Sequence, residues 1–150
     1  MRCILPKILL VEDNKLTRMA TERLLIKSGY LVVSAHDGEE ALQMASQEHP
    51  DVVLLDMMLP KLSGPEVLRG IKANHETATL PVIVLTGLSQ KNETRLLEDG
   101  ASAFVEKSAA LDSPDLLLSV IRQVLRTAAL AADLGNLPAN LPVPSASISA

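Results

Sequence analysis

Five polar side chains of this 150-residue sequence stand where short apolar runs end. They are three carboxylates, one hydroxyl and one ammonium group: Glu12, Asp13, Asp56, Thr86 and Lys107. Carboxylate oxygens suit Mg²⁺, which binds through a few such ligands and keeps several waters. A hydroxyl and an ammonium group beside the ion can hold the oxygens of a phosphoryl group, and an aspartate can attack its phosphorus. If the fold brings these groups together, they fit phosphoryl transfer onto a carboxylate, with Asp56 as the nucleophile.

The apolar runs predict the strands that would position these groups. Val52-Val53-Leu54-Leu55 is the clearest, because four consecutive apolar residues, two of them β-branched, are typical of a strand buried on both faces. The run ends at Asp56, and Leu59-Pro60 then prevents the chain from passing directly into a helix. The other predicted strands cover residues 7–11, 30–35, 82–85 and 102–106.

Helical patterns alternate with these strands. Asn14 is a natural N-cap for a helix over 15–27, Gly29 closes that helix, and Pro65 stands in the first turn of another. The remaining predicted helices cover residues 39–47, about 89–99, and the segment that Ser113-Pro114-Asp115 opens. Five strands alternating with five helices predict an α/β fold with a parallel sheet covered on both faces. Because the carboxyl ends of parallel strands share one edge, the polar side chains should converge there.

The composition argues against several other functions. Tyr30 and Phe104 are the only aromatic residues, which argues against binding of single-stranded nucleic acid by base stacking. The net charge of −4 and the scattered lysines and arginines provide no basic surface for a phosphate backbone. No apolar run approaches the roughly 20 residues of a transmembrane helix. Cys3 is the one cysteine and fits a reducing compartment, so we expect a cytoplasmic domain without direct nucleic-acid or membrane contact.

At these polar residues the sequence resembles the receiver domain of two-component response regulators, over about residues 5–127. The motifs that carry the resemblance occur in the family's order and approximate spacing: Glu12-Asp13-Asn14, Asp56-Met57-Met58-Leu59-Pro60 followed by Ser63-Gly64, Thr86-Gly87, and Lys107. Together with Arg18, the first motif is most similar to receivers of hybrid histidine kinases and phosphorelays. The resemblance implies a flavodoxin-like (βα)5 three-layer sandwich with a five-stranded parallel sheet of order 2-1-3-4-5.

The resemblance also implies how the carboxylates divide their roles. Asp56 would accept a phosphoryl group from the phosphohistidine of a histidine kinase or a histidine phosphotransfer protein. Mg²⁺ would be held by Asp13, Asp56 and the backbone carbonyl of Met58. Glu12 would contribute to the metal site through water.

A conformational switch is implied at the neighbouring strands. Thr86 and Lys107 would contact the phosphoryl oxygens, and Phe104 stands where the family couples an aromatic residue to the threonine. We expect phosphorylation to draw the Thr86 hydroxyl toward the anion and to let Phe104 turn inward. This would reshape the surface formed by residues 89–99, the fifth strand and the last helix, for a downstream protein target or a phosphorylation-dependent homodimer. Phe104 could equally be an ordinary core residue.

The sequence departs from the family after the lysine, where Ser108 replaces the usual proline and its cis peptide. A cis bond without proline costs roughly 2.5–4 kcal/mol, so we predict a trans 107–108 peptide. From Ala128 the composition shifts to alanine, leucine, proline and serine. Residues 128–150 are therefore predicted to extend the last helix to about Leu134 and then to form a tail or linker, with no output domain.

Three other readings of the site stay open. A phosphatase of the haloacid dehalogenase type needs a second aspartate two residues after the first, and Met58 stands there. A flavin binder of similar topology needs a phosphate loop rich in serine, threonine and glycine, whereas Glu12-Asp13 would repel a flavin phosphate. A receiver-like scaffold that never takes phosphate is compatible with Ser108. We predict a phosphoacceptor signalling switch that is not an independent metabolic enzyme.

Overall fold

The chain folds around a parallel five-stranded sheet whose strand order is β2-β1-β3-β4-β5. The computed structural model describes residues 5–87 and 93–135. Its strands are β1 (Lys7–Val11), β2 (Leu31–Ala35), β3 (Val52–Asp56), β4 (Val82–Thr86) and β5 (Ala103–Glu106). The order places β3 at the centre, and the predicted fold class and strand order are both confirmed.

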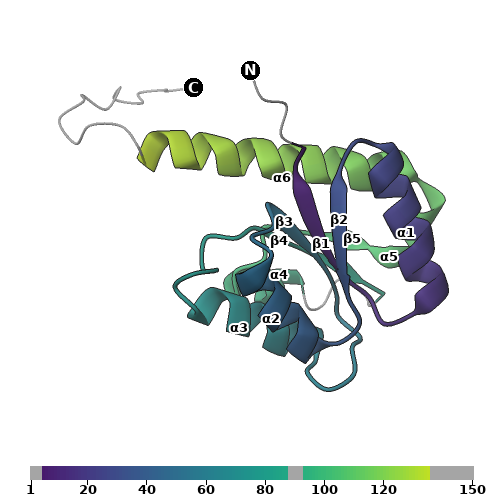
Figure 1. Cartoon of the computed structure of the whole chain (residues 1–150), viewed down its shortest axis with the longest axis horizontal. Helices are drawn as coiled ribbons and strands as arrows, with labels where there is room; N and C mark the ends of the chain where they lie inside the picture. The colour runs from purple at the N-terminus through teal and green to yellow at the C-terminus, as the bar shows by residue number, and fades with distance from the viewer. Residues whose placement is uncertain (1–4, 88–92, 136–150) are drawn as a thin grey trace.

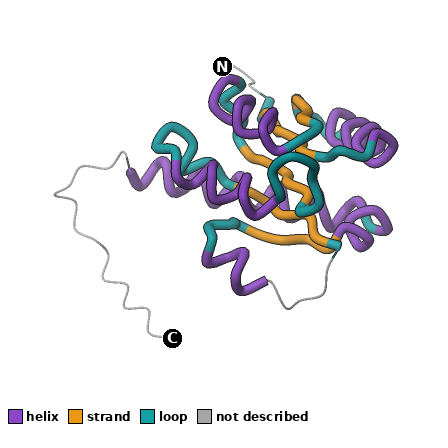
Figure 2. The backbone as a smooth tube through the Cα atoms, turned by 90° about the horizontal axis from the view of Figure 1, so that it is seen from below, coloured by secondary structure: helices purple, strands orange, loops and turns teal. Residues whose placement is uncertain are grey.

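Helices cover both faces of the sheet, as the alternating pattern predicted. They are α1 (Lys15–Lys27), α2 (Gly38–Gln47), α3 (Gly64–Ala73), α4 (Glu93–Glu98), α5 (Lys107–Asp112) and α6 (Pro114–Gly135). Figure 1 shows α2 and α3 on one side of the sheet and α1, α5 and α6 on the other. In Figure 2 the strands run side by side between the two groups of helices. None of the described helices is both long and apolar enough to cross a bilayer.

The three central strands are buried because alternate residues serve two separate cores. Leu9, Leu55 and Val84 pack with residues of α2 and α3 in one core. Leu10 and Leu54, which alternate with them, pack with residues of α1 and α6 in the other. The continuous apolar runs of the sequence thus reflect strands with a hydrophobic core on each face.

The local signals read from the sequence have the expected geometry. Asn14 Oδ1 accepts a hydrogen bond from the Thr17 N–H at 3.0 Å and caps α1. Gly29 has a φ of +96°, the left-handed conformation in which a glycine closes a helix. Pro65 lies in the first turn of α3, after the capping residue Ser63.

The segment after β5 differs from the prediction. The sequence predicts no helix between the fifth strand and the helix that Ser113 opens, but α5 begins at Lys107 and brings the helices of the described ranges to six. Ser108 explains the difference: a proline there would disfavour helical backbone at Lys107, whereas serine and the alanines that follow allow it. No cis peptide bond occurs in the described part of the chain, so the predicted trans 107–108 peptide is confirmed.

α6 continues unbroken to Gly135, past the change in composition at Ala128 and close to the predicted end at Leu134, and in Figure 1 it extends beyond the sheet. The proline-rich segment 136–150 lies outside the described residues. The helix expected to begin near Ser89 is described from Glu93, and residues 88–92 also lie outside the described ranges.

Candidate functional site

The carboxyl ends of four strands bring the predicted side chains to one edge of the sheet. Glu12 follows β1 directly, Asp56 ends β3, and Thr86 ends β4. Lys107 follows β5 and is the first residue of α5. The register pairs Asp56 with Leu85 and Thr86 with Glu106, so the strands end nearly level. The convergence expected from a parallel sheet is therefore observed.

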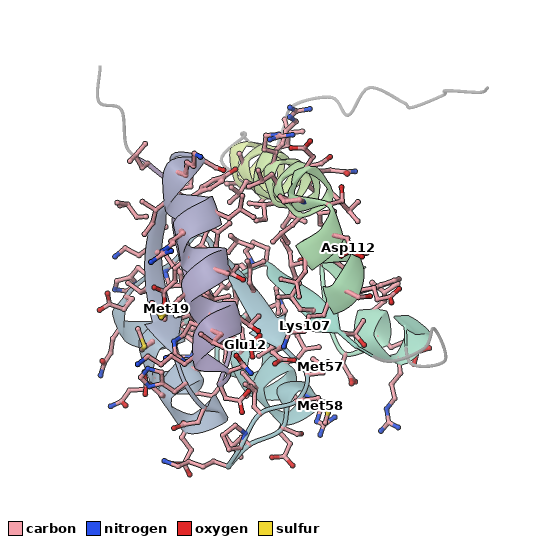
Figure 3. The ribbon with its side chains drawn as sticks, turned by 90° about the vertical axis from the view of Figure 1, so that its right-hand side faces the viewer. Glu12, Met19, Met57, Met58, Lys107 and Asp112 are labelled. Atoms are coloured by element: carbon pink, nitrogen blue, oxygen red, sulfur yellow. The ribbon has the colours of Figure 1, made fainter. Side chains whose placement is uncertain are left out.

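Lys107 joins two buried carboxylates. Its Nζ lies 3.0 Å from Asp56 Oδ2, to which it donates a hydrogen bond, and 2.6 Å from Glu12 Oε1. Glu12 is 1% exposed and Asp56 3%, whereas the Lys107 side chain is 26% exposed. Figure 3 shows Glu12 and Lys107 facing one another between α1 and α5, with Asp112 farther along α5. The ammonium is therefore partly exposed to solvent, whereas the two carboxylates that it contacts are buried.

The buried Glu12 Oε1 contacts the Lys107 ammonium, and the Asn14 N–H donates to Glu12 Oε2 at 3.2 Å. Burial raises the pKa of the Glu12 carboxyl, and the neighbouring Asp56 raises it further, against the lowering effect of Lys107. The site thus holds more negative charge than one ammonium compensates.

This excess charge is what a divalent cation would neutralise. Glu12, Asp13 and Asp56 each offer a carboxylate oxygen, and these oxygens lie within 4.8 Å of one another. All are hard oxygen ligands, and the site combines buried acids with the exposed Asp13. The donor set fits Mg²⁺, which prefers such ligands together with water.

The loop after β3 folds back over Asp56. The Met58 N–H donates to Asp56 Oδ1 at 3.1 Å, so the Met58 backbone lies against the carboxylate, while its side chain is exposed. The Gly64 N–H donates to the Met57 carbonyl at 3.1 Å and closes the loop against the start of α3. That the Met58 carbonyl is a metal ligand stays a prediction.

Replacing Gly64 by alanine is expected to lower the free energy of unfolding by about 1–3 kcal/mol. A Cβ there would lie 2.5 Å from Met57 Cα and 2.9 Å from the Asp56 carbonyl oxygen, and neither backbone atom can rotate away. Urea unfolding followed by circular dichroism measures the change. Gly87→Ala is the matched control, because a Cβ at Gly87 meets no described atom within 4 Å. Equal unfolding midpoints for the two variants would contradict this close approach.

Thr86 and Phe104 share one face of the sheet. The register pairs Val84 with Phe104 and Thr86 with Glu106, so Thr86 and Phe104 are diagonal neighbours. Thr86 is buried, and Phe104 is half-buried against the core that α2 and α3 cover. This arrangement is compatible with the predicted switch, which stays a prediction.

Two residues near the acidic loop were missed by reasoning from the sequence. Glu22 on α1 and Ser34 on β2 are linked to Arg18, which contacts the backbone of Glu12 and Asp13. The spacing of Arg18 and Glu22, four residues apart on one helix, was the available local signal. The link to Ser34 depends on tertiary contact and has no such signal.

Comparison with known proteins places the chain beside two-component regulators. The family model of the response regulator receiver domain matches residues 8–122. The polar-differentiation response regulator DivK of Brucella ovis is 37% identical over 101 residues, which cover 67% of this chain and 82% of DivK.

Solved structures show the same likeness. The chemotaxis protein CheY4 of Vibrio cholerae superposes with a TM-score of 0.74 at 26% identity, over 81% of this chain and 99% of that one. The receiver domain of the sensor histidine kinase PA1611 from Pseudomonas aeruginosa gives a TM-score of 0.72 at 29% identity, over 81% and 98% of the two chains. That structure has a magnesium ion coordinated in its active-site cleft.

Proposed function

Because this chain belongs to the response regulator receiver family of two-component systems, we propose that Asp56 is its phosphoacceptor. The observation that carries the proposal is the setting of this carboxylate. Asp56 ends the central strand, is buried, and lies 3.0 Å from an ammonium group and within 4.8 Å of two further carboxylates. Receiver domains act as signalling switches, and a nucleophile held among metal ligands suits that role.

In the proposed reaction an Asp56 oxygen bonds to phosphorus while the bond from phosphorus to a histidine nitrogen of the partner breaks. The electron pair of that bond stays on the imidazole. Lys107, now bound to Asp56, would turn its ammonium to a phosphoryl oxygen, and the Thr86 hydroxyl would hold another. Loss of the Lys107 contact with Asp56 and movement of Thr86 would couple phosphorylation to Phe104.

Mg²⁺ would be held by Asp13, Asp56 and the Met58 carbonyl, with Glu12 acting through water. When bound, the ion would neutralise the carboxylates and the phosphoryl oxygens that approach them. The excess negative charge, three carboxylates beside one ammonium, supports this assignment. The magnesium ion in the PA1611 receiver supports it by analogy.

We assign the donor to the class of histidine kinases and histidine phosphotransfer proteins, and the output to a downstream protein. The similarity of Glu12-Asp13-Asn14 and Arg18 to receivers of hybrid kinases favours a phosphorelay partner. A reducing compartment such as the cytoplasm is consistent with the single cysteine. A phosphorylation-dependent homodimer remains one form of output for the surface beside β5.

The direct test is the intact mass of the protein after incubation with acetyl phosphate. We expect a gain of one phosphoryl group in the presence of Mg²⁺ and no gain when EDTA removes the ion. Acetyl phosphate needs no protein partner, so the result depends on the site alone. A protein that binds Mg²⁺ but gains no mass would contradict the proposed function and would favour a scaffold that works without phosphorylation.

A further inference from the structure

The acidic loop between β1 and α1 holds the carboxylates of Glu12 and Asp13 close to that of Asp56. Its backbone is fixed on one side by the Glu12 N–H, which donates to the Ala35 carbonyl at 3.2 Å. On the other side Arg18 Nη1 donates to the Glu12 carbonyl at 3.0 Å and to the Asp13 carbonyl at 3.5 Å. One guanidinium therefore contacts the backbone of both acidic residues.

The guanidinium is itself held in place. Arg18 Nε lies 3.8 Å from Glu22 Oε1, and the same oxygen accepts a hydrogen bond of 2.7 Å from Ser34 Oγ on β2. The Arg18 side chain is only 14% exposed. These contacts connect β2 through Glu22 and Arg18 to the loop that carries the metal ligands, and the Arg18–Glu22 contact is the longest of them. An arginine suits this position because its planar group offers several donors in fixed directions.

We propose that Arg18 is a positioning residue for the metal site and that Glu22 and Ser34 set its orientation. The proposal rests on the Mg²⁺-dependent function given above. Free of Arg18, the backbone at Glu12 and Asp13 would sample other conformations, since nearby carboxylates repel one another. A binding cation would then have to order the loop, and its affinity would fall. Groups that orient metal ligands in this way commonly change metal affinity by about 10–100-fold when they are replaced.

A surface ion pair on α1 is the simpler reading of the Arg18–Glu22 contact. The distance of 3.8 Å is at the outer limit for such a pair, and exposed pairs of this spacing contribute little to stability. The hydrogen bonds of Arg18 to two carbonyls are shorter and lead to the acidic loop instead. We therefore expect metal affinity to depend on Arg18 more than folding does.

The experiment is a titration with Mn²⁺, in which the electron paramagnetic resonance signal of the free ion reports binding without any phosphorylation. We expect Arg18→Ala to weaken Mn²⁺ binding about tenfold and Arg18→Lys to give an intermediate value. Arg23→Ala is the matched control, because Arg23 is an exposed arginine on the same helix. Arg18→Ala and Arg23→Ala each lose one positive charge, a change that by itself would favour a cation, whereas Arg18→Lys keeps the charge. A weakening in both Arg18 variants that is absent from Arg23→Ala would therefore reflect lost positioning.

Two further variants keep the test decisive. Glu22→Gln preserves size but removes the charge that faces Arg18, and we expect a smaller loss of Mn²⁺ affinity. Ser34→Ala should act in the same direction. All titrations are made at a temperature where circular dichroism shows each variant folded. If Arg18→Ala fails to fold, Arg18→Lys and Glu22→Gln decide the question.

The outcomes separate this proposal from the function on which it rests. Wild-type affinity in folded Arg18→Ala, or in both Arg18→Lys and Glu22→Gln, would overturn the positioning role alone. A wild-type protein that binds no Mn²⁺ would overturn the metal-dependent function, and the positioning role with it. Weakened binding in the Arg18 variants, with Arg23→Ala unchanged, supports the proposal.

Discussion

Asp56→Asn is expected to abolish the mass gain that acetyl phosphate and Mg²⁺ give to the wild-type chain. The amide has no anionic oxygen to attack phosphorus, while its size and its carbonyl oxygen are retained. That oxygen can still accept the hydrogen bond from the Met58 N–H, so the loop after β3 should keep its course. Intact-mass measurement under identical conditions gives the result directly.

The same variant is expected to unfold no more easily than the wild type in the absence of Mg²⁺. It removes one of two buried carboxylates that lie side by side, and Lys107 keeps its contact with Glu12. A loss of labelling with the fold intact would therefore be a loss of chemistry. Asp112→Asn is the control, because Asp112 is an exposed carboxylate away from the site. Full labelling of Asp56→Asn would place the acceptor on another residue.

The convergence of Glu12, Asp56 and Lys107 could be predicted because it depends only on topology. In a parallel sheet the carboxyl ends of all strands lie on one edge. The residue types at the strand ends are therefore enough to predict which side chains meet there. The strands were recognisable because β3 and β4 are buried on both faces and hence uninterruptedly apolar. Asn14 before α1 and Pro65 in the first turn of α3 indicated the helix starts independently.

The helix that begins at Lys107 could not be predicted in the same way. α5 is six residues long, which is too short to show a helical period. Its stability comes from tertiary contact: Ala110 packs in the core that includes Leu25 of α1 and Leu117 of α6. The role that we propose for Arg18 has no signal in the sequence for a related reason, because its link to Ser34 through Glu22 joins elements that only the fold brings together.

Lys107→Met is expected to destabilise the protein at neutral pH by roughly 1–3 kcal/mol. Removing one partner of a buried ion pair usually costs about 3–5 kcal/mol, and the smaller figure allows for the partly exposed lysine. In the wild type burial lowers the pKa of Lys107, but its contacts with Glu12 and Asp56 outweigh that effect and raise it. Urea unfolding compares the variant with Lys27→Met, a control at an exposed lysine.

The difference in stability between Lys107→Met and the wild type should shrink as the pH is lowered. Burial and the neighbouring Asp56 raise the pKa of Glu12 above its ordinary value of 4.5, and loss of the lysine removes a group that opposes this rise. A carboxyl whose pKa is raised on folding favours the folded state below its unfolded pKa. That contribution is lost as the pH rises through the folded value. The variant should therefore approach wild-type stability near pH 4.5 and fall behind it above that value.

Mg²⁺ should restore more stability to Lys107→Met than it adds to the wild type. In the wild type the ion enters a site where an ammonium already offsets part of the charge; in the variant it supplies the only cation beside Glu12 and Asp56. Phosphorylation should nevertheless fall by about 10²–10³-fold, because a bound ion does not replace the donor that would hold a phosphoryl oxygen. In Lys107→Met, Mg²⁺ would thus restore stability without restoring phosphorylation. The reason is that charge neutralisation and phosphoryl binding are two distinct roles of the same ammonium. Phosphorylation of Lys107→Met at the wild-type level would contradict the role in phosphoryl binding. An equal gain in stability from Mg²⁺ in both proteins would contradict the role in charge neutralisation.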